Sequence, residues 1–390
     1  MSFAKRQINR DKLIEKKKMQ VPFFDYKHIF NQHKKELSEI IINISEKGSF
    51  ILQNELKDFE KNFASYINAD YSVGVGNCTD GLLLALKAAG VGNGDEVIFC
   101  SHTFVATASA IHFSGADPVP VECASDHLID TKMVQSAITS RTKAVIPTQL
   151  NGQICDMDSI GAICKKNNLL LIEDAAQSLG ATFKGKTAGT FGIASSFSFY
   201  PAKNLGCFGD GGSVATNDEK FFENLALLRD HGRSHNGEVV QWGMNSRLDN
   251  LHAAILDFKL SKYPDEIKRR REIAMMYDEG LKAISELKLP TPPSADSDKY
   301  EVFQNYEIEV VSEEDREPLR SHLNKKGVGT ILQWGGKAVH EFERLGLKAH
   351  LPFTESLMRR AFLLPMNTSL QNNQVELVVE SVNNFFGYGK

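Results

Sequence analysis

The sequence predicts an α/β protein with a parallel sheet, followed by a smaller α+β domain. Between about residues 50 and 216, short apolar strand patterns alternate with helical patterns, as they do where crossover helices join parallel strands. After residue 217 this alternation stops, and charged helical patterns lead to a Pro-rich stretch at 289–297 that is typical of a linker. A chain of 390 residues is long enough to form a two-domain enzyme.

Helices and strands are expected to alternate through the first part of the chain. An apolar stripe of Leu56, Phe59, Phe63 and Ile67 predicts an amphipathic helix at 53–67. Thr79 is expected to cap a second helix, at 79–89. Further helices are expected at 104–114, 131–138 and 156–167. Strands are expected at 71–75, 96–100, 118–121, 143–148, 169–173, 195–199 and 213–216.

The second part is predicted to be mostly helical. Helical patterns cover 218–229, 248–260 and 264–284. Residues 300–311 alternate like a strand, and Ser312 is expected to open a helix as a capping box with Asp315. These patterns divide the chain into four predicted parts, which are an N-terminal arm at 1–30, a large α/β domain at 31–262, a linking helix at 263–289 and a small α+β domain at 290–390.

Composition excludes several classes of protein. A net charge of −4 gives no reason to expect nucleic acid as a partner, and no apolar run approaches the length of about 20 residues that a membrane helix needs. Residues 1–20 carry seven Lys or Arg against two acidic residues and are expected to form a solvated basic leader. None of the six cysteines has zinc-ligand spacing, so we expect reduced thiols, no metal and a cytoplasmic location.

Residues 74–81, Gly-Val-Gly-Asn-Cys-Thr-Asp-Gly, place a glycine turn between an expected strand and an expected helix. Free N–H groups and the positive end of the helix favour an anion at such a turn, usually a phosphate. The dinucleotide-binding fingerprint would need Gly at position 79, where this chain has Thr. Taken alone, the segment is either a phosphate cradle or an ordinary tight turn.

Two further segments contain candidate site residues. Asp174 ends a buried apolar strand, at the edge where parallel sheets bind their ligands, and it either faces a cationic ring nitrogen or caps the following turn. Gln177 lies three residues on. Lys203 lies between an apolar strand and a glycine-rich turn, and it is either a surface lysine or a lysine that forms a Schiff base.

Together, a phosphate cradle, a strand-end Asp and a later Lys are what a pyridoxal phosphate site requires. Four segments read Glu-Asp-Ala-Ala-Gln, Ser-Phe-Tyr-Pro-Ala-Lys-Asn-Leu-Gly, Gly-Asp-Gly-Gly and Gly-Met-Asn-Ser-Arg-Leu-Asp. With these motifs the chain resembles the DegT/DnrJ/EryC1/StrS sugar aminotransferases, from about residue 22 to the C-terminus. This resemblance implies fold type I, with a mixed, mostly parallel seven-stranded sheet flanked by helices and a smaller α+β C-terminal domain.

The resemblance also implies roles around a pyridoxal 5'-phosphate cofactor. Lys203 would form a Schiff base with it and move the proton between substrate carbon and cofactor carbon. Asp174 would pair with the pyridinium nitrogen, and Gln177 would reach the ring hydroxyl. Phe104, in Ser-His-Thr-Phe-Val-Ala-Thr, would lie against the ring face.

The phosphate of the cofactor would be held by several groups. These are implied to be the backbone of Thr79 and Asp80 and the hydroxyl of Ser198. Asn245 would reach the phosphate from a neighbouring subunit, which implies a homodimer with shared active sites. Residues 148–152 read Thr-Gln-Leu-Asn-Gly where the family usually has Val-His-Leu-Tyr-Gly, and this difference leaves open any substrate role of Gln149 or Asn151.

The reaction implied is transfer of an amino group from L-glutamate, which becomes 2-oxoglutarate, to a nucleotide-linked keto sugar. The wording at 245–249 and 333–340 resembles the members that act on 3-keto sugars, and it predicts a dTDP-3-keto-6-deoxyhexose as acceptor and a dTDP-3-amino-3,6-dideoxyhexose as product. Arg247, Trp334 and Lys337 are the candidate substrate contacts.

Other functions stay open at this point. One is a 4-keto sugar aminotransferase that acts on a UDP-, GDP- or dTDP-sugar. A sugar dehydratase is disfavoured because such members carry His in place of the lysine. A non-catalytic regulator is disfavoured by the intact set of site residues, and a nicotinamide oxidoreductase by the incomplete fingerprint.

Overall fold

The computed structural model describes residues 19–295 and 298–389, so the predicted basic leader lies almost wholly outside the described residues. The large sheet has seven strands in the order β1-β9-β8-β5-β4-β2-β3. Their bounds are β1 Tyr71–Val75, β2 Glu96–Cys100, β3 Asp117–Val121, β4 Thr142–Ile146, β5 Leu170–Asp174, β8 Ala194–Ser198 and β9 Gly212–Thr216.

The sheet is mixed and mostly parallel, as the sequence predicts. Strand β9 pairs in antiparallel fashion with both β1 and β8, whereas β8, β5, β4, β2 and β3 pair in parallel along the rest of the sheet. The parallel strands therefore end at one edge, and the residues at or just after those ends are brought together there.

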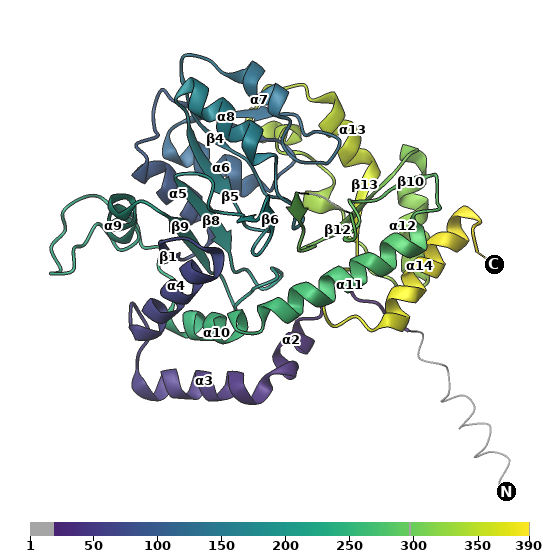
Figure 1. The fold of residues 1–390 in the computed structure, drawn as a ribbon, viewed down its shortest axis with the longest axis horizontal. Coiled ribbons are helices and arrows are strands. Elements are labelled where there is room, and N and C mark those ends of the chain that lie inside the picture. The colour runs from purple at the N-terminus through teal and green to yellow at the C-terminus, as the bar shows by residue number, and fades with distance from the viewer. Residues whose placement is uncertain (1–18, 296–297, 390) are drawn as a thin grey trace, which may run out of the picture.

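Helices cover both faces of this sheet (Figure 1). Strand β2 shows why, since its side chains alternate between the two cores. Val97 and Phe99 pack with α5 (Cys78–Ala88) and α6 (Val105–Ser114). Ile98 and Cys100 belong to the other core, together with α4 (Asn54–Ile67), α8 (Met157–Asn167) and α10 (Asn250–Leu260).

Helix α11 (Tyr263–Leu281) joins the two parts of the chain. Its first half contributes Ile267 to the core of the large sheet, and its second half contributes Ile273 and Tyr277 to the C-terminal core. Figure 1 shows α11 running from beside α10 toward α12 and α14. The division of the chain into four domains stays a prediction.

The C-terminal part contains a three-stranded sheet, β10-β12-β13. Its strands are β10 Leu287–Lys288, β12 Tyr306–Val310 and β13 Ala361–Leu364, and its helices are α12 Arg316–Lys325, α13 Pro352–Arg360 and α14 Asn372–Phe386. The remaining helices are α2 Tyr26–Gln32, α3 Lys34–Lys47, α7 Thr131–Ala137 and α9 Glu219–Leu228, and a small sheet holds β6 Thr182–Phe183, β7 Lys186–Thr187 and β11 Lys299–Tyr300.

Three local predictions are wrong. The N-cap of α5 is Asn77, whose side chain accepts a hydrogen bond from the Asp80 N–H, so Thr79 lies inside the helix. The strand expected at 300–311 is interrupted, because Phe303 has a φ of 49° that extended backbone cannot adopt. Ser312 makes no capping hydrogen bond, and a short 3₁₀ turn precedes α12.

The part of the N-terminal arm that the structure describes, from residue 19 on, lies against the C-terminal part. Val21 forms a parallel bridge with Val328, and its carbonyl accepts from the Gly329 N–H at 2.9 Å. Gly327 and Gly329 leave room for this contact, since a Cβ on Gly327 would lie 2.8 Å from the Met19 carbonyl oxygen. The arm thereby carries Phe23 and Phe24 to the site described below.

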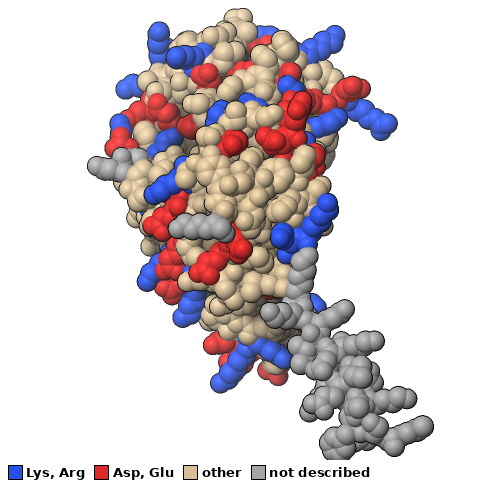
Figure 2. All heavy atoms as spheres, turned by 90° about the vertical axis from the view of Figure 1, so that its right-hand side faces the viewer, with Lys and Arg blue, Asp and Glu red and all other residues tan. Residues whose placement is uncertain are grey.

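The molecular surface carries both signs of charge. Figure 2 shows acidic and basic side chains intermixed on the face that lies at the right of Figure 1. Such a mixed face lacks the single-sign field that attracts nucleic acid. Among residues 19–295 and 298–389, no helix combines the length and the apolarity that crossing a bilayer demands.

Candidate active site

A cavity of about 570 Å³ lies where the parallel strands end. Residues from both parts of the chain line it, including the ends of β5 and β8, the start of α5 and the segment around residue 304. The predicted site residues that line this cavity are Thr79, Phe104, Asp174, Gln177, Ser198, Lys203 and Trp334.

The first turn of α5 offers N–H groups to this cavity. Asn77 satisfies the N–H of Asp80, whereas those of Cys78 and Thr79 have no hydrogen-bond partner among the described residues. Gly81 brings the turn close to β8, because a Cβ there would lie 2.3 Å from the Ser196 hydroxyl oxygen. The positive helix end and these two donors form a cradle suited to an anion.

Ser198 and Asp80, which are both predicted to hold the phosphate, differ in their position relative to this cradle. Ser198 ends β8 and lines the cavity, and its oxygen accepts from the Tyr200 N–H at 3.4 Å. The Asp80 carboxylate accepts from the Ser246 hydroxyl at 2.7 Å, and Asp80 is not among the lining residues. The backbone N–H predicted to serve at Asp80 is therefore used for capping the helix.

Asp174 lies buried at the end of β5. One oxygen, Oδ2, accepts from the Thr107 hydroxyl at 2.7 Å, and the other accepts from the Ala176 N–H at 3.2 Å. Burial raises the pKa of this carboxyl, against the hydrogen bonds and the nearby Lys203 charge that lower it. A buried carboxylate of this kind favours a cationic partner in the cavity.

Thr107 ends a chain of three buried hydroxyls. The Oγ1 atoms of Thr103 and Thr107 are 3.0 Å apart, and those of Thr103 and Thr148 are 2.9 Å apart. Thr107 donates a hydrogen bond to Asp174, so Thr103 must donate to Thr107, and Thr148 must donate to Thr103. The sequence analysis missed these residues, although two of them lie in the quoted Ser-His-Thr-Phe-Val-Ala-Thr segment.

Lys203 projects from a tightly held loop. The side chain of Gln304 donates to the Ala202 carbonyl at 3.0 Å and accepts from the Asn204 N–H at 2.8 Å, so it holds the backbone on both sides of the lysine. Burial lowers the pKa of Lys203, and the charges of Cys78 and Asp174 oppose that shift. A lysine that loses its proton this readily can act as a nucleophile.

Gln177 and Phe104 complete the cavity wall. The amide oxygen of Gln177 accepts from the Asn151 N–H at 2.8 Å, which leaves its amide nitrogen available. The Phe104 side chain is 55% exposed although it lies in the cavity wall, so one of its faces can cover a flat ligand.

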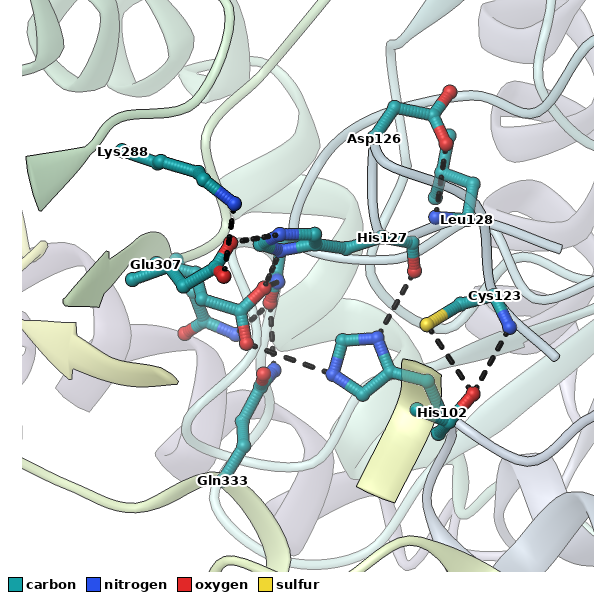
Figure 3. Close-up of polar contacts among 12 residues, drawn as sticks. His102, Cys123, Asp126, His127, Leu128, Lys288, Glu307 and Gln333 are labelled. Atoms are coloured by element: carbon teal, nitrogen blue, oxygen red, sulfur yellow. Dashed lines mark hydrogen bonds and ion pairs between the residues drawn. The ribbon is translucent and has the colours of Figure 1, made fainter. Parts of the chain in front are cut away.

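A buried charged cluster surrounds Glu307 (Figure 3). His127 Nδ1 lies 2.7 Å from Glu307 and its Nε2 lies 3.4 Å from Glu309, while His102 Nε2 lies 3.5 Å from Glu307. The two glutamates raise the pKa of His127 to about 9, against the effect of burial. These residues are far apart in sequence, and no local pattern brings them together.

The wall also carries Trp334, and the remaining predicted contacts lie elsewhere. The Trp334 ring lines the cavity and meets the His102 ring edge-on, with centroids 5.2 Å apart. Arg247 pairs with Asp230 at 3.0 Å. Asn245, Arg247 and Lys337 are not among the residues of this chain that line the cavity.

The residues that line the cavity fit one kind of ligand. The cradle at α5 suits a phosphate, Asp174 suits a protonated ring nitrogen, and Lys203 suits a carbonyl carbon. An open α/β sheet with these three features at one edge defines an enzyme of the pyridoxal phosphate-dependent class. The available nitrogen of Gln177 and the aromatic face of Phe104 agree with a flat ring between them.

Comparison with known proteins identifies the family. Residues 31–383 match the DegT/DnrJ/EryC1/StrS aminotransferase family, and the chain belongs to it. It is 38% identical over 368 residues to the dTDP-3-amino-3,4,6-trideoxy-alpha-D-glucose transaminase of Streptomyces venezuelae, covering 93% of this chain and 95% of that protein. It is 40% identical over 374 residues to the dTDP-3-amino-3,6-dideoxy-alpha-D-galactopyranose transaminase of Aneurinibacillus thermoaerophilus, covering 94% and 100%.

Another relative carries a different nucleotide in its name. It is the UDP-2-acetamido-2-deoxy-3-oxo-D-glucuronate aminotransferase of Pseudomonas aeruginosa, 34% identical over 365 residues, which cover 93% of this chain and 100% of that protein. The prediction of an aminotransferase is thereby confirmed, and the three relatives are named for nucleotide-linked sugars.

Solved structures of related proteins are similar to this fold. The structure of Streptomyces venezuelae DesV in complex with a ketimine intermediate has a TM-score of 0.89 at 37% identity, over 94% of this chain and 98% of that one. The Bacillus subtilis NtdA structure with its bound cofactor PMP has a TM-score of 0.87 at 27% identity, over 94% and 85%. Fold type I and the pyridoxal phosphate cofactor of the family are confirmed.

Proposed function

We propose that this chain transfers an amino group between L-glutamate and a nucleotide-linked 3-keto sugar. The observation that carries the proposal is that Lys203 and Asp174 line the same cavity as the phosphate cradle at the start of α5. That arrangement places a nucleophilic amine, a buried acid and an anion site around one space. A binding protein or regulator would not need all three.

The position of each residue in the cavity determines its role toward the cofactor. When bound, pyridoxal phosphate supplies the electron sink that transamination needs. Asp174 would hold the ring nitrogen protonated, and Gln177 would offer its amide nitrogen to the ring hydroxyl. Lys203 would hold the cofactor covalently and serve as the base that moves the proton, for which its lowered pKa suits it.

The phosphate and the ring face need other residues. The N–H of Thr79 and the hydroxyl of Ser198 would hold the phosphate, and Phe104 would cover the ring and exclude water. Asp80 supports the cradle through the hydrogen bond that its N–H donates to Asn77, rather than as a direct ligand.

The active enzyme is a homodimer. Between α9 and α10 the chain extends away from the body of the molecule at the left of Figure 1. Trp242 on this segment is 97% exposed, and Val239 and Val240 are exposed beside it. Exposed apolar side chains of this size favour a partner subunit. Asn245 lies on the same segment outside the cavity of its own chain, so it serves the partner's phosphate site.

The sugar acceptor is a dTDP-3-keto-6-deoxyhexose. The wording at 245–249 and 333–340 supports this choice, and two of the relatives above are named as dTDP-3-amino sugar transaminases. Trp334 offers its ring to the sugar or base from the cavity wall. Arg247 and Lys337 do not line the cavity of their own chain, so their substrate role rests on the family resemblance alone. A UDP-linked acceptor is the second candidate, favoured by the Pseudomonas aeruginosa relative.

Turnover on a small panel of amino sugars tests the proposal. The loaded enzyme is incubated with 2-oxoglutarate and either a dTDP-3-amino-3,6-dideoxyhexose, a dTDP-4-amino sugar or a UDP-3-amino sugar, and the glutamate formed is measured. Glutamate is expected with the dTDP-3-amino sugar. Glutamate with only the dTDP-4-amino sugar or only the UDP-3-amino sugar would overturn the choice of substrate, and none with any of the three amino sugars would overturn the proposed reaction. The cytoplasmic location stays a prediction.

A further inference from the structure

A polar network connects the cavity wall with β12, and Asn151 lies at its centre. Asn151 is 3% exposed. Its amide nitrogen donates to Glu307 at 3.1 Å. Its amide oxygen accepts from Gln333 at 2.6 Å and from Asn305 at 2.8 Å. Figure 3 shows Gln333 and Glu307 pointing into the same region from different segments.

The chemistry of Glu307 fixes the direction of these bonds. Glu307 also faces His127 and His102, which hold its pKa far below the usual range although it is buried. An ionised carboxylate only accepts hydrogen bonds, so Asn151 must turn its NH₂ group toward Glu307. Its oxygen is then left for the two donors on the other side.

The same network holds the backbone of Asn151. Residue 151 has a φ of 57°, a left-handed conformation that asparagine tolerates better than most residues. Its N–H donates to the amide oxygen of Gln177 at 2.8 Å, and Asn305 approaches the same oxygen at 3.4 Å. The amide nitrogen of Gln177 has no partner among the described residues and is left for the cavity.

We propose that Asn151, anchored by Glu307, is a positioning residue that keeps the amide nitrogen of Gln177 turned toward the bound cofactor. This role rests on the proposed function, because it assumes pyridoxal phosphate in the cavity. Gln177 is the residue that touches the cofactor, and Asn151 acts through it. If Asn151 lost its anchors, Gln177 could turn its oxygen toward the ring hydroxyl and offer no donor.

A double-mutant cycle on cofactor affinity tests the link. Pyridoxal phosphate is titrated into the apo forms of wild type, Asn151→Gly, Gln177→Ala and the double variant, and the dissociation constants are compared. Glycine accepts the left-handed backbone without strain, so the substitution removes only the side-chain anchors. Asn151→Gly is expected to weaken binding about 10-fold in the wild-type background and less than about twofold in the Gln177→Ala background.

The matched control is Asn168→Gly, because Asn168 is also left-handed, with a φ of 53°, but is exposed at the end of α8. It is expected to leave the affinity unchanged. Equal weakening by Asn151→Gly in both backgrounds would overturn the proposal, because the effect would not pass through Gln177. No weakening in either background would overturn it as well.

A second variant covers the case in which Asn151→Gly does not fold, as judged by urea unfolding of the apo form. Asn151→Asp keeps the size of the side chain and places an oxygen against Glu307, and the same dependence on Gln177 is expected. If wild type itself failed to bind pyridoxal phosphate, the proposed function would fall, which is a different outcome from an unlinked Asn151.

Discussion

The hydroxyl of Thr107 donates a hydrogen bond of 2.7 Å to Oδ2 of Asp174. It is the last of three aligned threonine hydroxyls, and it opposes the rise that burial causes in the pKa of Asp174. The hydrogen bond thus favours the ionised form of a carboxyl whose burial disfavours charge.

Thr107→Val tests the contribution of this hydroxyl. Valine has nearly the same shape but cannot donate, and a hydrogen bond to a charged group contributes about 1.5–3 kcal/mol. We expect kcat to fall about 10-fold or more and the acid limb of the pH–rate profile to move upward. Thr190→Val is the control, because buried Thr190 donates to the Thr187 carbonyl instead. A variant with wild-type kcat would show that the threonine chain has no part in the reaction.

Asp174→Asn tests the buried acid itself. An amide cannot keep the ring nitrogen protonated, whereas the cradle at α5 and Ser198 still bind the phosphate. We expect kcat to fall by several orders of magnitude while the cofactor stays bound, measured by steady-state turnover and by cofactor content. A loss of less than tenfold would mean that Asp174 mainly caps its turn through the Ala176 N–H.

Lys203→Ala separates binding from catalysis. The amine is lost, but the phosphate cradle and Asp174 are unchanged, so pyridoxamine phosphate should still bind noncovalently. We expect no measurable turnover together with retained cofactor. Turnover like that of wild type would remove Lys203 from the mechanism, whatever the cofactor content.

His127 predicts a pH dependence of stability in the apo protein. Its pKa is about 9 in the folded protein, against an ordinary value of 6.5, because Glu307 and Glu309 face it. Glu307 also faces His102, and Glu309 also pairs with Lys288 and Arg360. The protonated form is favoured on folding, so its stabilisation is complete below about pH 6.5 and is lost as the pH rises through 9.

His127→Asn checks this dependence, since asparagine accepts the φ of 65° at that position. The free energy of unfolding, measured with urea from pH 6 to 10, should fall by up to about 3 kcal/mol more in wild type than in the variant. Parallel curves for the two proteins would show that His127 does not titrate in this range.

Much of the fold could be predicted from local patterns. Apolar strands such as Leu170–Asp174 and the stripe on Asn54–Ile67 indicate their structure without tertiary information. The cap of α5 could not be assigned reliably, because Asn77 and Thr79 are both common at helix N-termini. The strand expected across 300–311 was wrong because the left-handed Phe303 interrupts it, at a point where Arg270 binds the carbonyls of residues 303 and 304.

The site was predictable only in part for a similar reason. Asp174, Gln177 and Lys203 lie in motifs that can be read one at a time. Gln304 and Glu307 form contacts across a hundred or more residues of sequence, and ordinary polar residues in a C-terminal strand region carry no local signal of that role.

The measurement that tests the central claim most directly is borohydride reduction of the pyridoxal phosphate-loaded protein, followed by peptide mapping. The account predicts that the reduced cofactor is attached at Lys203 and that Lys203→Ala carries none. Attachment at another lysine, or no attachment in protein that has been saturated with pyridoxal phosphate, would contradict it.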